Sequence, residues 1–245
     1  MDSNFGWRIV LLVTYLLITA SAFGQKEHDF YFSEFKKFAA LSKEEISLGK
    51  LRDSSQVASK KNATAKERYR FGALVVNAFD KKSVSESRCQ FFAKEATKLL
   101  KKEELNLSPA YCYVVARLGL IHLGMGEFQR EAARRFYESE HTPVSANVYA
   151  RVLSYDSSLS NRAKGLQYAL EAQQKQPDSV KLRWLVGGSY FAKADYTKEK
   201  QYWQACINEY KKALEIAKAG KDKDFSEDDL NLIRHYLEYA QKKLK

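Results

Sequence analysis

The residues able to do metal or acid–base chemistry are sparse and scattered in this chain. Its four histidines are His28, His122, His141 and His235. No two of them stand four residues apart around a carboxylate, so the sequence contains no HExxH zinc motif. A metal ion would need ligands gathered from distant helices. We therefore expect no metal site and no cofactor.

Residues for covalent or phosphate chemistry are missing from the sequence as well. It contains no GxSxG elbow and no Cys–His arrangement. The stretch Gly124-Met125-Gly126 lacks the Lys and Ser/Thr that follow in a phosphate-binding loop. Paired acids such as Glu44–Glu45 fall in predicted first turns, where they favour the helix dipole. We expect no catalytic residues, no enzyme activity and no small-molecule substrate.

The three cysteines are Cys89, Cys112 and Cys206, and none belongs to a CxxC motif. An odd number cannot pair completely within one chain, and buried free thiols are the default interpretation. An exported chain could still oxidise two of them. Cys89 and Cys112 fall on consecutive predicted helices, so a Cys89–Cys112 disulfide is the alternative.

The formal net charge is +11, which favours polyanions, anionic lipid or acidic proteins as neighbours. The lysines are spread as pairs at 36–37, 60–61, 81–82, 101–102, 211–212 and 242–243. Scattered pairs are typical of solvated helix faces, so two interpretations stay open: ordinary solvation and a basic surface that binds an anionic envelope component. We expect no nucleic-acid partner under either interpretation.

The N-terminus predicts export. Arg8 precedes the apolar run IVLLVTYLLITASAF, and Ala20-Ser21-Ala22 has the small-x-small pattern of a cleavage site. This run of about 15 residues is shorter than the roughly 20 that a spanning helix needs. We expect a cleaved signal peptide at residues 1–22 and a periplasmic or secreted protein, with a retained N-terminal membrane anchor as the alternative. In a eukaryotic host, Asn62-Ala63-Thr64 would accept a glycan.

The prolines are few and evenly spaced. Pro109, Pro143 and Pro177 are the only three in the chain, at intervals of 143 − 109 = 34 and 177 − 143 = 34. Ser108-Pro109 and Thr142-Pro143 have the pattern of an N-cap followed by proline at the first helical position. Asp178 or Ser179 could cap a helix that begins near Val180. Each interval has room for two helices, which predicts a repeated helix–turn–helix unit.

These residues resemble the tetratricopeptide repeat family. The stretches GSYFAKADY and ALEAQQKQPD match its pattern well, and Gly119 and Gly187 occupy the position where the family prefers a small residue. Asp156, Arg162 and Glu138 depart from it. The resemblance covers about residues 109–217. It implies an all-α, right-handed α-solenoid of antiparallel helical hairpins.

The expected organisation has seven segments. They are a signal peptide (1–22), an N-terminal helical segment and linker (23–62), a divergent helical hairpin (63–108), three repeats (109–142, 143–176 and 177–220) and a capping helix (221–245). The stretch RDSSQVASKKNATAK (52–66) is expected to be a polar linker. The third repeat should have a long second helix from about Thr197 to Ala219. Capping boxes are predicted at Ser42/Glu45, Thr64/Glu67 and Ser83/Glu86.

In the resembled family the first helix of each pair lines a concave binding surface. Carried over residue by residue, the resemblance implies the following groove candidates: Tyr69, Asn77, Tyr113, Asn147, Arg151, Lys181 and Trp184. Amides and aromatic rings would suit an extended peptide. The alternative for Tyr113 and Trp184 is packing between helices.

The function that these patterns favour is that of a non-catalytic, exported helical-repeat scaffold or adaptor, which binds another protein or a peptide in its groove. The alternative is a basic envelope protein that binds a polyanion or a membrane surface.

Overall fold

The computed structural model describes residues 25–220 and 227–244, and within them every regular element is helical. The expected all-α fold is confirmed. In chain order the elements are α2 (Gln25–Ala40), α3 (Leu48–Ala58), α4 (Ala65–Asp80), α5 (Glu86–Leu99), the 3-10 helix η1 (Lys102–Asn106), α6 (Pro109–His122), α7 (Glu127–Glu140), α8 (Pro143–Ser154), α9 (Leu159–Lys175), α10 (Val180–Thr197), α11 (Lys200–Lys218) and α12 (Glu227–Leu244).

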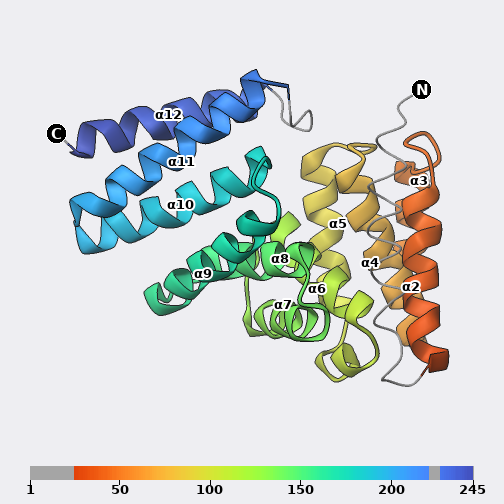
Figure 1. Cartoon of the computed structure of the whole chain (residues 1–245). Helices are drawn as coiled ribbons and strands as arrows, with labels where there is room; N and C mark the ends of the chain where they lie inside the picture. Colours follow the sequence, from red (N-terminus) through yellow and green to blue (C-terminus); the bar gives the residue numbers. More distant parts are fainter. Residues whose placement is uncertain (1–24, 221–226, 245) are drawn as a thin grey trace. The chain divides into compact units, whose positions relative to one another are not determined.

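The helices form two compact units, and the chain passes from the first to the second between Glu140 and His141. In unit 1, helix α4 contacts α2, α3, α5 and α6, and α2 also contacts α6. In unit 2, each helix from α8 to α12 packs against the next one along the chain, and α8 also contacts α10 (Figure 1). First helices of neighbouring pairs therefore touch within both units.

The predicted helix starts at the prolines are confirmed. Pro109 and Pro143 each occupy the first turn of a helix, where the missing N–H has no intrahelical partner to lose. Ser108 Oγ accepts a 3.1 Å hydrogen bond from the Ala110 N–H, and Thr142 Oγ1 accepts a 3.0 Å bond from the Ser145 N–H. Pro177 lies in the turn before α10, and Ser179 is the residue that caps this helix.

One predicted linker is wrong. The whole of RDSSQVASKKNATAK was expected to be a polar linker, but residues 52–58 are the greater part of α3. Leu51 and Ala58 are seven residues apart, two helical turns, and both are buried. This apolar stripe is narrow, and polar residues between its members hide it in the sequence.

The capping predictions had mixed outcomes. The box at Thr64 and Glu67 is confirmed, with both reciprocal hydrogen bonds present. Ser42 and Glu45 make the same pair of bonds, but they close a turn, and the next helix begins at Leu48 with Ser47 as its cap. The box at Ser83 is wrong, because α5 begins at Glu86 and the Ser83 hydroxyl donates instead to the carbonyl of Ala78.

The C-terminal helices follow the expected design. Helix α11 has 19 residues against 14 in α7, and Cys206 and Ala213, seven residues apart, are both fully buried along it. Helix α12 buries Ile233 and packs Leu230, Leu237 and Leu244 on the same core. The predicted stripe therefore covers a face that α11 would otherwise expose to water.

Close approach between helices needs a glycine at residue 187. A Cβ on Gly187 would lie 2.5 Å from Cε1 of Tyr210, whose ring is 1% exposed on α11. The next residue, Gly188, has room, because its Cβ would lie 3.8 Å from the Tyr210 hydroxyl. The repeat pattern predicted a small residue at 187, and the Tyr210 ring supplies the physical reason.

We expect Gly187→Ala to lower the free energy of unfolding by about 1–3 kcal/mol, because a rigid buried ring must move. The matched control Gly188→Ala should leave it unchanged or raise it by up to about 1 kcal/mol, since alanine is the better helix former. Urea unfolding followed by circular dichroism measures both. Equal effects of the two variants would contradict the packing argument.

Candidate functional site

In unit 1, helix α2 covers the face of α4 and α6 that the repeat pattern assigned to a ligand. The Tyr31 ring of α2 packs edge-on against Tyr69 of α4 at 4.9 Å and against Tyr111 of α6 at 5.8 Å between ring centroids. Tyr69 and Tyr111 stack at 5.9 Å. All three side chains are at most 1% exposed. The face is therefore closed by a segment of the same chain.

The three groove candidates of unit 1 have internal partners. Tyr69 donates a 2.8 Å hydrogen bond to the carbonyl of Tyr31. Asn77 is buried and donates a 2.8 Å bond to the carbonyl of Ala73, one turn back on its own helix. The half-buried Tyr113 packs its ring 5.3 Å from Phe35 of α2. Tyr69 and Asn77 thus have no surface to offer a peptide, which corrects the roles predicted for them.

Charged contacts hold α2 at its side and at its C-terminal end. Buried Glu34 accepts a 2.6 Å bond from Arg70 Nε and a 2.7 Å bond from Lys37 Nζ. Burial raises the pKa of the Glu34 carboxyl, but the hydrogen bonds from Arg70 and Lys37 outweigh this and leave the pKa below its usual value. Lys81 Nζ donates to the carbonyls of Ala39 and Leu41 at the end of the helix.

In unit 2, the remaining candidates lie on α8 and α10, two first helices in direct contact. Asn147 and Arg151 are half-buried, one turn apart on α8. The Asn147 Oδ1 atom is buried and accepts no hydrogen bond from any described residue. On α10, Lys181 is exposed, while Trp184 is half-buried and packs against the core shared by α10, α11 and α12. Trp184 therefore packs between helices, which was the alternative to a role in the groove.

The three cysteines are free thiols in the structure, so the alternative of a Cys89–Cys112 bridge is corrected. Two of the thiols contact different carbonyls: Cys89 Sγ lies 3.7 Å from the oxygen of Val84, and Cys112 Sγ lies 3.2 Å from that of Leu105. Burial raises the pKa of Cys89 to about 11 and that of Cys112 and Cys206 to about 12. Thiols of this kind are poor nucleophiles.

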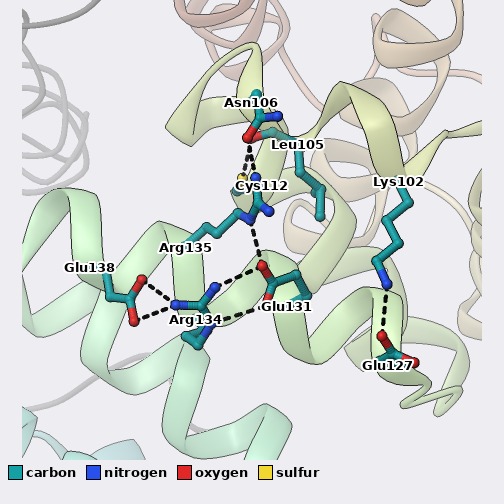
Figure 2. A network of polar contacts seen from close by, with 9 residues as sticks. All are labelled: Lys102, Leu105, Asn106, Cys112, Glu127, Glu131, Arg134, Arg135 and Glu138. Atoms are coloured by element: carbon teal, nitrogen blue, oxygen red, sulfur yellow. Dashed lines mark hydrogen bonds and ion pairs between the residues drawn. The ribbon is translucent and has the colours of Figure 1, made fainter.

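A polar network on α7 was not identified from the sequence (Figure 2). Arg134 holds Glu131 with bonds of 2.7 and 2.9 Å and Glu138 with bonds of 2.5 and 2.6 Å. Arg135 bonds Glu131 at 2.6 Å and also donates to Asn106 of η1. In the stretch EAARRFYE the acids and arginines stand three and four residues apart, which is the spacing of ion pairs along a helix. This spacing could have indicated the network from the sequence alone.

This network joins α7 to η1 through ion pairs and hydrogen bonds. Lys102 Nζ and Glu127 add a second link of 2.7 Å between η1 and α7. The hydrogen bond from Arg134 is the main reason why the pKa of Glu131 is lowered to about 2, so this carboxylate stays ionised and paired near neutral pH. Among residues 25–220 and 227–244, no group of three or more His, Cys, Asp or Glu side chains is arranged to hold a metal ion.

The predicted signal peptide at 1–22 lies outside the described residues. Of the helices that the structure does describe, none combines the length and the apolar character needed to cross a membrane. Comparison with known proteins returned no matching family model, no matching curated protein and no matching solved structure. The function of the chain is therefore inferred from its own surfaces.

The cysteines should be inert in the folded protein. Because burial raises all three pKa values well above 9, we expect a thiol reagent at about pH 8 to modify almost none of them in the native state. After denaturation under non-reducing conditions, all three should react. A count of one reactive thiol under those conditions would instead show that two are joined in a disulfide.

Glu131 should make unit 1 sensitive to acid. Its pKa is lowered on folding, so its stabilising contribution is complete above about pH 4.5 and is lost as the pH falls toward about 2. We expect Glu131→Gln to reduce the free energy of unfolding by about 1 kcal/mol at pH 7. The difference from wild type should shrink as the pH approaches 2. Glu103→Gln, an exposed position on η1, is the control and should have little effect in thermal unfolding at either pH.

Proposed function

We propose that this protein is a non-catalytic, exported helical-repeat scaffold that binds another protein or a peptide. The contacts between first helices, α4 with α6 and α8 with α10, support a solenoid of helical hairpins. In this proposal the solenoid is right-handed and similar to the tetratricopeptide repeat, and the N-terminal residues 1–22 direct export.

One observation carries the proposal. Tyr113 is four residues after Pro109, and in unit 1 its ring contacts Phe35 of the bound helix α2 at 5.3 Å. The same position recurs after 34 residues as Asn147 and after 34 more as Lys181. The equivalent face of unit 2 is therefore the proposed binding surface, formed by Asn147 and Arg151 of α8 and Lys181 of α10.

The occupied face of unit 1 indicates how such a surface binds a chain segment. Helix α2 contributes aromatic rings and one acid, Glu34, which pairs with Arg70 at 2.6 Å, and the Tyr69 hydroxyl binds a backbone carbonyl of the segment. In unit 2 the corresponding polar groups are an amide, a guanidinium and an ammonium. We infer a partner segment that bears a carboxylate for Arg151 or Lys181.

The net charge of +11 supports an acidic partner, because long-range attraction raises the rate of encounter with a negatively charged chain. Trp184 contributes rigidity to this surface and little direct contact, since it packs on the core of α10, α11 and α12.

A photo-crosslinker tests the location of the surface. We expect benzoylphenylalanine at Lys181 to give a discrete crosslinked partner in the native host. The same residue at Lys164, an equally exposed lysine on the second helix α9, should give none. Arg151→Ala should weaken the complex by about tenfold through the loss of a charge-assisted hydrogen bond.

Lys181→Gln is the second variant, because it changes an exposed side chain and leaves the fold intact. Circular dichroism identifies any variant that has lost its helices. Crosslinking that is equal at positions 181 and 164, or binding that neither variant weakens, would contradict the proposed surface.

A further inference from the structure

Two large apolar side chains of unit 1 protrude into water. Phe91 on α5 is 61% exposed and Leu123, the residue that ends α6, is 63% exposed. Within the described part of unit 1 the next such side chain, Val57, is 39% exposed. Neither Phe91 nor Leu123 belongs to the peptide-binding face proposed above.

A hydrogen bond brings the two segments together. Thr97 Oγ1 of α5 lies 3.1 Å from Nε2 of His122, the last residue of α6, and Leu123 follows directly. Lys94 is one turn before Thr97 on α5. Burial lowers the pKa of His122, and the positive charge of Lys94 adds to this effect, which is consistent with their proximity. Phe91 is three residues before Lys94 on the same exposed stripe.

Both side chains are held in their exposed positions. The Phe91 ring rests edge-on against Phe92 at 5.4 Å, and Phe92 is buried against Phe71 at 6.1 Å. Leu123 has a left-handed backbone with φ of 55°, a conformation that usually belongs to glycine at the end of a helix. A leucine there strains the backbone and exposes an apolar side chain to water.

The surroundings of these two residues are basic. Arg88, Lys94 and Lys98 are exposed on the same side of α5. Lys98 pairs with Glu95 at 2.8 Å, whereas Arg88 and Lys94 form no ion pair with any described residue. Lys101, just after the helix, adds another exposed cation.

We propose that Arg88, Phe91, Lys94, Lys98 and Leu123, the α5 surface, bind the anionic face of a lipid bilayer, with Phe91 and Leu123 inserted among the headgroups. Single apolar side chains ringed by long cationic ones match the boundary between headgroups and acyl chains. A protein partner would need a contiguous apolar area at the centre of its interface. Here Lys94 stands between Phe91 and Thr97, the residue of α5 that meets His122, so the bilayer fits better.

A local probe tests this in the full-length chain. The apolar run near the N-terminus could itself hold the chain on a vesicle, so overall binding is not the readout. Leu123→Cys is labelled with the fluorophore NBD, which brightens in an apolar environment, while the three native thiols are buried. The same label at Tyr155→Cys, an exposed ring in unit 2 next to Asp156, is the control.

We expect the NBD label at 123 to brighten with phosphatidylcholine vesicles that contain about one third phosphatidylglycerol, and the label at 155 to stay unchanged. Salt near 1 M, where the Debye length is about 3 Å, should remove the response. Lys94→Gln with Lys98→Gln should raise the lipid concentration for half-maximal signal by about 25-fold, at roughly fivefold for each lysine.

The charge-matched pair Lys60→Gln with Lys61→Gln, two exposed lysines in the turn after α3, should change this concentration by less than about twofold. The proposal is overturned if the label at 123 does not respond, if pure phosphatidylcholine acts equally well, or if the two lysine pairs have equal effects. Brightening with polyglutamate but not with vesicles would assign the α5 surface to an acidic protein instead.

Discussion

An amphipathic helix cannot bury its own apolar face and needs another element to cover it. In unit 1 three tyrosines form the contact that covers these faces. Tyr31, Tyr69 and Tyr111 come from α2, α4 and α6, and each is at most 1% exposed. Their rings close one core across the three helices, and the Tyr69 hydroxyl meets a carbonyl of α2 at 2.8 Å, so the burial leaves this polar group satisfied. The rest of unit 1 is arranged around this contact, because α4 and α6 would otherwise expose a broad apolar surface.

In unit 2 the apolar helix faces are buried with the help of a glycine and a terminal helix. The missing side chain of Gly187 lets the Tyr210 ring of α11 approach α10, and α12 then covers the outer face of α11 with Ile233. Each unit therefore has a flanking helix that shields apolar residues: α2 on the N-terminal side of unit 1 and α12 on the C-terminal side of unit 2. This similarity explains why the chain needs helices on both sides of its repeated segment.

The distribution of polar groups separates structural from functional surfaces. The network of Glu131, Arg134 and Arg135 pairs its charges internally and joins α7 to η1. The α5 surface, in contrast, carries the exposed Arg88 and Lys94, which form no ion pair with any described residue. Groups of the second kind are the ones able to gain energy from a partner, since groups already paired would have to break existing bonds first.

The sequence by itself determined the all-α class, the helix starts at Ser108 and Thr142 and near Val180, and the small residue at 187. These features follow from local rules: an N-cap oxygen meets nearby N–H groups, and a repeated pattern places like residues on like faces. The position of α2 could not be derived in this way. Periodicity shows which face of α4 is apolar but not whether a ligand or a distant segment covers it, and for that reason Tyr69 and Asn77 were assigned to a groove. Only the tertiary structure decided this, because the contact between Tyr31 and Tyr69 joins residues 38 positions apart, and no local pattern encodes their approach.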